Sequence, residues 1–187
     1  DFALPTSFLI VAGELEAYSG TVTWGMTTKF GYMPKDIKEF FKESHLHFVE
    51  WLMQFSQNDQ SDAFLRSFLG RMLFSGDEVL KKVSVLSGGE KMRCMFSKMM
   101  LQTGNVLLLD DPTNHLDLES ISSLNDGLKA FKESIIFASH DHEFIQTLSN
   151  RIIVISKNGV IDRIDETYDE FLENAEVQAK VQELWKA

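Results

Sequence analysis

The stretch Asn105–Asp117, NVLLLDDPTNHLD, decides the fold class of this 187-residue chain. It opens with a continuous apolar run and ends that run on two adjacent acids, Asp110 and Asp111. A short strand that is apolar on both faces is typical of a parallel sheet covered by helices. A helical pattern near 118–131 then separates this run from a second apolar run, SIIFASH, at 134–140. The sequence therefore predicts an α/β fold with a mostly parallel sheet.

The end of this strand is the first candidate site. Ligands of α/β proteins bind at the carboxyl ends of parallel strands. Asp110 can hold a magnesium ion there, directly or through water. Asp111 is placed to orient or polarise an attacking water, and His140, at the end of the next predicted strand, could hydrogen-bond a terminal phosphate. A lone histidine or acid pair at a strand end is more often structural, so the order of all three elements carries the prediction.

A second candidate site lies at the start of a helix predicted to run through Leu101. The sequence VSVLSGGEKMRC, residues 83–94, places Ser87, Gly88 and Gly89 at this start. Several backbone N–H groups are unpaired at a helix start, and the helix dipole favours an anion there. Glycine also lets a phosphate approach the backbone closely. Taken alone, an ordinary helix cap explains the turn at least as well.

The composition bounds the class of protein. The chain is 44% hydrophobic and 25% charged, as in ordinary globular proteins, and its net charge is -10. This charge argues against autonomous nucleic-acid binding, because phosphate neutralisation needs clustered Lys and Arg. The single cysteine, Cys94, excludes an internal disulfide and fits a reducing cytoplasm. The apolar run in residues 1–16 is too short for a membrane span and lacks the basic region of a signal peptide. Since the chain begins in this run without a Met, we expect a piece that starts inside a domain.

The remaining patterns complete the expected organisation. In chain order they are a buried helix closed by Gly13, short strands at 20–24 and 27–33, a helical region with Ser61 as one cap, a hairpin across SKNG at 156–159, and one charged amphipathic helix from Thr167. We expect a single domain over 1–187. Its parts are a helical subdomain at 36–100, an α/β core at 101–165 and a C-terminal helical tail at 166–187.

Three motifs together resemble a known family. LSGGE (86–90), VLLLDDPTNHLD (106–117) and SHD (139–141) resemble the signature, Walker B, D-loop and H-loop motifs of ATP-binding cassette (ABC) ATPases. NHLD and the preceding GRMLFSGDEVLKKVSVLSGGEKMR are similar to the ABC-F family in particular, and the resemblance covers roughly 8–168. ABC-F proteins are soluble and carry two cassettes in one chain, and many act on the ribosome as translation or antibiotic-resistance factors. SHDHEF and the ending soon after the hairpin favour the second, C-terminal cassette.

The resemblance implies a fold and a mechanism. The fold is a P-loop NTPase-like ABC cassette with an inserted helical signature subdomain, and the cofactors are ATP and Mg²⁺. Two cassettes would face each other head to tail and sandwich two ATP molecules. The residues implied to bind the ATP held by the partner cassette are Ser87, Gly88, Gly89 and Glu90, with Asn114 to Asp117 reaching across the interface. Asp110 would hold the metal and Asp111 and His140 would act catalytically on this cassette's own ATP.

The sequence departs from the family pattern at three places. The phosphate-loop pattern G-x-x-x-x-G-K-[ST] does not occur, and DFALPT aligns where it should end, so the resemblance is to an N-terminally incomplete cassette. We expect the isolated chain to be inactive or weak as an ATPase. Lys35 stands where a glutamine normally contacts magnesium and water; a cation there would repel a metal but could hold a phosphate. Asp111 replaces the usual glutamate, and a misplacement on the order of 1 Å can cost ~10²-fold in rate, which weakens hydrolysis rather than abolishing it.

The sequence thus predicts a cytoplasmic ATP-binding cassette of ABC-F type. It would couple ATP binding and hydrolysis at a composite dimer site to a translation-related role. The expected partners are a second ABC cassette and the ribosome. Two alternatives stay open: a degenerate, non-hydrolytic cassette that serves as an interaction module, and the nucleotide-binding subunit of a transporter.

Overall fold

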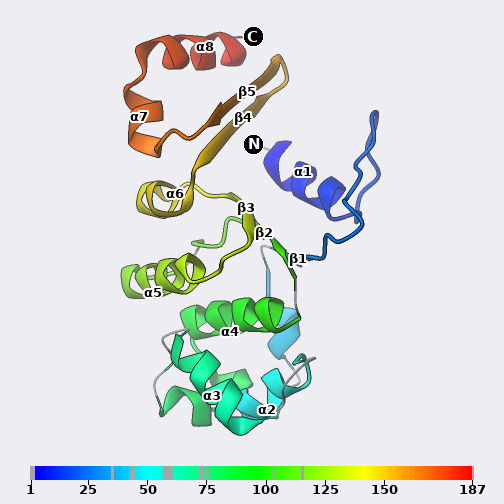
Figure 1. The fold of residues 1–187 in the computed structure, drawn as a ribbon, viewed down its shortest axis with the longest axis vertical. Helices are drawn as coiled ribbons and strands as arrows, with labels where there is room; N and C mark the ends of the chain where they lie inside the picture. Colours follow the sequence, from blue (N-terminus) through cyan, green and yellow to red (C-terminus); the bar gives the residue numbers. More distant parts are fainter. Residues whose placement is uncertain are drawn as a thin grey trace. The chain divides into compact units, whose positions relative to one another are not determined.

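The computed structural model describes residues 3–34, 36–42, 45–56, 61–71, 74, 76–102, 104–114 and 116–186. The chain divides into two compact units. The larger unit spans 21–138, and the smaller unit combines 1–20 with 139–187. Figure 1 shows the elements of each unit in chain order. The domain boundaries expected from the sequence follow the motifs instead, and they stay a prediction.

A three-stranded parallel sheet forms the centre of the larger unit. Its order is β1 (Phe30–Met33), β2 (Val106–Asp110) and β3 (Ser134–Ala138). The side chains of Leu107, Leu108 and Leu109 on β2 are fully buried, as expected for a central strand whose two faces are covered. Asp110 pairs with Ala138, so the carboxyl ends of β2 and β3 lie side by side. The predicted parallel sheet is therefore confirmed.

Helices fill the rest of the larger unit. They are α2 (Phe48–Met53), α3 (Asp62–Arg71), α4 (Gly88–Leu101) and α5 (Leu118–Lys129), with three 3₁₀ turns, η1 (Lys38–Phe41), η2 (Glu78–Leu80) and η3 (Val83–Val85). Helix α4 lies between the sheet and the pair α2 and α3 (Figure 1). A Cβ atom on Gly31 of β1 would lie 3.1 Å from the Met99 side chain of α4, so helix and strand approach closely. Helix α4 also contacts α2 and α5, so the sheet and both helices together set its position within this unit.

The smaller unit is a hairpin with helices around it. It contains α1 (Ala3–Val11), α6 (His142–Leu148), β4 (Arg151–Ser156), β5 (Gly159–Ile164), α7 (Tyr168–Glu173) and α8 (Ala175–Trp185). Strands β4 and β5 are antiparallel, which confirms the hairpin expected across 156–159. Gly13 follows α1 with a φ of +77°, the left-handed conformation that commonly ends a helix. The Asn158 side chain at the hairpin tip donates to the Leu184 carbonyl at 2.9 Å and so caps the end of α8.

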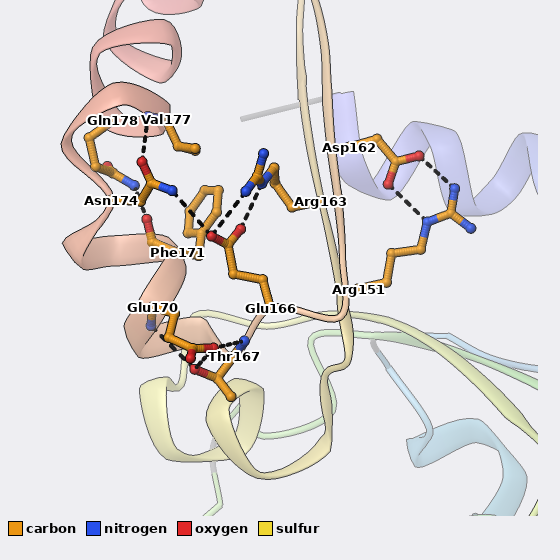
Figure 2. A network of polar contacts seen from close by, with 10 residues as sticks. All are labelled: Arg151, Asp162, Arg163, Glu166, Thr167, Glu170, Phe171, Asn174, Val177 and Gln178. Atoms are coloured by element: carbon orange, nitrogen blue, oxygen red, sulfur yellow. Dashed lines mark hydrogen bonds and ion pairs between the residues drawn. The ribbon is translucent and has the colours of Figure 1, made fainter.

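The end of the hairpin is tied to the last two helices by a polar cluster (Figure 2). Arg163 Nε donates to Glu166 Oε2 at 2.7 Å, and Asn174 Nδ2 donates to Glu166 Oε1 at 3.4 Å. The hydrogen bond from Arg163 is the main cause of a lowered pKa of Glu166. Asn174 also accepts from the Val177 amide at 3.2 Å and thereby begins α8. One carboxylate therefore connects β5 to the junction of α7 and α8.

Three expected elements differ from the structure. Residues 20–24 were expected to form a strand but are irregular, and the strand expected at 27–33 begins only at Phe30. A strand needs a neighbour for its backbone groups, and within the described ranges none pairs with 20–24. The tail expected as one helix from Thr167 is two helices, because Asn174 has an extended backbone (φ -73°, ψ 96°) and starts the second one. Expectations based on alternation or amphipathicity alone were wrong here.

Candidate nucleotide-binding surfaces

The turn that begins α4 is a helix cap with an exposed outer side. Ser87 Oγ accepts a hydrogen bond from the Glu90 amide at 3.2 Å, and Glu90 Oε2 accepts one from the Ser87 amide at 2.6 Å. This reciprocal pair is a capping box, so the ordinary cap expected from the sequence is present. Ser87 and Gly88 are nonetheless exposed. The cap and an outward-facing turn therefore coexist in the same residues.

Glu90 shapes this turn from inside. Only 7% of Glu90 is exposed, and its second oxygen, Oε1, accepts from Lys81 Nζ at 2.5 Å. Burial by itself raises the pKa of Glu90, but the hydrogen bonds from Lys81 and Ser87 outweigh it, and the net pKa lies below the ordinary value. The same hydrogen bond raises the pKa of Lys81. Glu90 is thus a buried carboxylate whose charge is matched by a lysine from the preceding loop.

The two glycines of the turn have different surroundings. A Cβ atom on Gly88 would have nothing within 4 Å, whereas a Cβ atom on Gly89 would overlap the side chain of Ser120 on α5. The amides of the first residues of a helix have no acceptor within the helix. Gly88 therefore offers an open backbone surface beside Ser87, while Gly89 allows α4 and α5 to meet.

The start of α5, which follows Asn114 and Asp117 in the chain, lies next to the turn at Ser87. Asp117 Oδ1 accepts from the Ser120 amide at 2.8 Å and begins α5. This backbone hydrogen bond is the main cause of a lowered pKa of Asp117. Asn114 belongs to the tight turn between β2 and α5, where its amide donates to the Asp111 carbonyl at 3.1 Å. Because Gly89 packs on Ser120, the structure places the turn at Ser87 next to the α5 start that follows Asn114.

The end of β2 carries the two acids. Asp110 is 6% exposed and is the last residue of the central strand. Asp111 has a φ of 51°, a left-handed conformation that is uncommon for residues other than glycine, and its amide donates to the Ala138 carbonyl at 2.9 Å. Strained backbone of this kind is often found at functional sites. The chain thus turns sharply between two acids at the ligand-binding edge of a parallel sheet.

Asp110 is chemically suited to magnesium. The described residues contain no group of three or more acidic, His or Cys side chains that could hold a metal by themselves. Mg²⁺ usually needs no such group, since it binds through one or two carboxylates together with substrate phosphates and water. A single carboxylate at a strand end therefore fits a Mg²⁺ that arrives with a nucleotide.

The structure does not test the roles of two predicted site residues, His140 and Lys35. His140 is exposed and belongs to the smaller unit, just before Asp141, whose side chain accepts from the Phe144 amide at 2.7 Å and begins α6. Lys35 lies outside the described residues, as does His115 in the segment from Asn114 to Asp117. The roles expected for His140 and Lys35 remain predictions.

Sequence reasoning missed Lys81 and Ser120. Lys81 lies in the loop after η2, nine residues before its partner Glu90, and no local spacing rule joins a loop lysine to a helix cap. Ser120 meets Gly89 from α5, which is separated from α4 by strand β2 in the chain. The glycine pair was the one available signal, since a second glycine at a helix start indicates that another segment or a ligand approaches the backbone closely.

The sequence is similar to those of known proteins. The family model described as ABC transporter matches residues 6–114. The chain belongs to the ABC transporter family. The ABC transporter ATP-binding protein YkpA of Bacillus subtilis, itself uncharacterised, is 60% identical over 99% of this chain and 34% of its own length. ABC transporter F family member 2 of Arabidopsis thaliana is 41% identical over 64% of this chain and 17% of its own length. The chain is therefore an ABC-F-like cassette, and it spans about a third or less of the length of these relatives.

Solved structures show the same fold. The archaeal ribosome recycling factor aABCE1, in complex with the ribosomal stalk protein aP1, matches with a TM-score of 0.65 and 23% identity over 81% of this chain and 29% of its own. An inward-facing metal-chelate type ABC transporter matches with a TM-score of 0.68 and 14% identity over 95% of this chain and 72% of its own. Both likenesses confirm the α/β cassette fold expected from the sequence. ABC cassettes bind ATP, typically with Mg²⁺, and pair with another cassette. Among the described helices, none has the length and apolarity that crossing a membrane requires.

Proposed function

We propose that this chain is one cassette of a cytoplasmic ABC-F type ATPase, and that ATP and Mg²⁺ bind at a composite site which it forms with a second cassette. Ser87 and Gly88 contact the terminal phosphate of ATP held by the partner cassette, and Asn114 and Asp117 reach across the same interface. Asp110 holds the metal of this cassette's own nucleotide, with Asp111 and His140 acting on the attacking water and the terminal phosphate. Lys35 contacts a phosphate of that nucleotide.

The contact between Gly89 and Ser120 is the observation that supports this proposal most strongly. It joins the exposed turn at Ser87 and the start of α5 into one surface, although 33 residues separate Ser87 from Ser120 in the sequence. A surface that serves only this cassette's own fold would not need Ser87 and Gly88 to be exposed. An incoming anion would meet amide donors and the positive end of the dipole of α4.

ATP-dependent association tests the proposal. The chain alone is expected to bind a fluorescent ATP analogue weakly, since no phosphate-loop pattern occurs in its sequence. Mixed with a cassette that has an intact phosphate loop, the chain should associate in the presence of ATP and Mg²⁺, as measured by analytical ultracentrifugation. Ser87→Arg should abolish this association, because it places a long side chain on the phosphate-facing turn. Micromolar binding by the chain alone, or association that Ser87→Arg leaves unchanged, would contradict the proposal.

The expected biological target is the ribosome. The aABCE1 structure contains a ribosomal stalk protein, and ABC-F relatives are present among the similar proteins. Co-sedimentation with ribosomes in the presence of ATP should therefore retain the pair of cassettes in the pellet. A transporter subunit would instead remain in the supernatant and bind membrane proteins.

A non-hydrolytic cassette is the second candidate. The conformation of Asp111 favours it, because a φ of 51° fixes the direction of a side chain that is already one methylene shorter than the usual glutamate. Phosphate release by the associated pair separates the two: an ATPase releases phosphate at a rate that falls with Asp111→Asn, whereas an interaction module associates without releasing it.

A further inference from the structure

A buried carboxylate lies directly behind the proposed phosphate-binding turn. Glu90 follows Ser87 by three residues, and its Oε2 is bonded to the Ser87 amide at 2.6 Å. A full negative charge this close to the turn would repel the anion that the turn is proposed to bind. The repulsion would act at short range and through a partly buried region, where solvent screens charges poorly. Anion binding at Ser87 therefore requires a cation that neutralises Glu90.

We propose that Lys81 is this cation, and that it is a positioning residue which sets the charge of the signature turn. The inference rests on the proposed function, and it assigns Lys81 and Glu90 to one electrostatic unit behind Ser87. Lys81 Nζ lies 2.5 Å from Glu90 Oε1, on the oxygen that the Ser87 amide does not use. Glu90 thus holds the turn with one oxygen and is neutralised through the other.

The backbone around Lys81 is fixed, so its side chain reaches Glu90 from a defined place. The Lys81 amide donates to the Glu78 carbonyl at 3.1 Å, and the Lys81 carbonyl accepts from the Phe48 amide at 3.0 Å. Glu78 in turn accepts from Arg93 of α4 at 3.0 Å. The loop that carries Lys81 is therefore attached both to α2 and to α4, whose first turn contains Glu90.

Lys81 is much more exposed to solvent than the carboxylate of Glu90 that it neutralises. The Lys81 side chain is 42% exposed, while that of Glu90 is 9% exposed. Replacing Lys81 therefore leaves the core intact but leaves a buried charge without its partner, and breaking such a pair is costly. Lys82 is the matched control, since it is the next residue, carries the same charge and is exposed.

The experiment measures the ATP concentration that gives half-maximal association between this chain and a cassette with an intact phosphate loop, with Mg²⁺ present. Lys81→Gln and Lys81→Met should each raise this concentration on the order of tenfold, and Lys81→Arg should keep it near the wild-type value. Lys82→Gln should change it by less than about twofold. Adding Glu90→Gln to Lys81→Gln should return the half-maximal ATP concentration toward the wild-type value, because it removes the negative charge that Lys81→Gln leaves without a partner. Thermal unfolding of every variant reports whether the fold is kept.

The outcomes distinguish a failure of the role proposed for Lys81 from a failure of the proposed function. If Ser87→Arg abolishes association while Lys81→Gln and Lys81→Met leave it unchanged, the proposed function stands and the role of Lys81 is wrong. If the double variant is as impaired as Lys81→Gln, Lys81 acts by something other than neutralising Glu90. If the wild-type chain does not associate with the second cassette in the presence of ATP and Mg²⁺, the proposed function fails, and the inference fails with it.

Discussion

Gly89 lies so close to Ser120 that a Cβ atom on Gly89 would stand 2.7 Å from the Ser120 Cβ atom. Carbon atoms that are not bonded do not approach to this distance, so only glycine fits between α4 and α5. The contact fixes the distance between the turn at Ser87, which begins α4, and the turn that begins α5. Any side chain at position 89 must push the turn at Ser87 away from the start of α5.

Gly89→Ala should lower the free energy of unfolding by about 1–3 kcal/mol, the usual cost of overpacking. Ser120→Gly in the same chain removes the overlapping atoms and should recover a large part of this loss. A double-mutant cycle by urea denaturation measures the coupling between the two sites. Strictly additive losses would show that the overlap with Ser120 is not the cause.

Unlike Gly89→Ala, Gly88→Ala should weaken ATP-dependent association with little effect on stability. A Cβ atom on Gly88 meets nothing within 4 Å, so the stability should change by no more than about 0.5 kcal/mol. The methyl group would nonetheless stand on the exposed turn where a phosphate must approach, and ATP-dependent association should weaken. Gly70→Ala on α3 is the matched control, since a Cβ atom there also meets nothing within 4 Å. Equal association of both variants would argue against phosphate contact at Gly88.

Asp111→Ala should destabilise the chain by about 1 kcal/mol relative to Asp111→Gly, because alanine adopts the left-handed conformation at a cost that glycine does not have. Asp111→Asn should lie between them, since asparagine tolerates this conformation better than alanine. Thermal denaturation of the three variants gives the order. Alanine and glycine variants of equal stability would mean that residue 111 does not keep a φ of 51° in solution.

The pKa shift of Glu90 predicts a pH-dependent contribution to stability. Its pKa is lowered from the ordinary 4.5, so the stabilisation is present above pH 4.5 and is lost as the pH falls through the lower value of the folded state. The free energy of unfolding of the wild type should exceed that of Glu90→Gln by about 1.5–3 kcal/mol at pH 7, the usual contribution of hydrogen bonds to charged groups, and the difference should shrink toward pH 3. Urea denaturation at several pH values measures it. A difference that is constant with pH would exclude the ionised capping box.

Asn174→Ala should loosen the last two helices. The variant loses both the cap of α8 and the hydrogen bond to Glu166, and the loss of an N-cap costs about 1 kcal/mol. Amide hydrogen exchange should rise in α8, while β2 should stay protected. Asn158→Ala is a useful comparison, since it removes a cap from the other end of the same helix. Unchanged exchange in α8 would contradict the connection in Figure 2.

Sequence reasoning located the parts of the fold that depend on local or strongly patterned signals. The apolar run of β2 predicted a central parallel strand, and the turn residues predicted the hairpin of β4 and β5. The cap at Ser61 is confirmed as well, because Ser61 Oγ accepts from the Phe64 amide at 3.3 Å. These signals lie within a few residues of the feature that they predict.

Features that depend on residues distant in the sequence could not be predicted from local patterns. The alternation at 20–24 resembles a strand, but strand formation depends on a neighbour that no local pattern reveals. The pairing of Lys81 with Glu90 depends on how the loop after η2 folds back toward α4. The glycine pair at 88 and 89 looked uniform in sequence, yet one glycine is open and the other is packed against α5. The candidate site residues were proposed from their motifs, whereas the contacts that hold them in place could not be predicted from the sequence.

The capping role of Ser87 also determines which way its hydroxyl group can act. The oxygen accepts from the Glu90 amide, and the hydroxyl group also donates a hydrogen bond to the Glu90 carboxylate, which contributes to the lowered pKa of Glu90. Aspartate would cap the helix equally well but would present a second negative charge and no proton. A hydroxyl residue at this position therefore lets a single group end the helix and also stabilise the ionised carboxylate behind the turn.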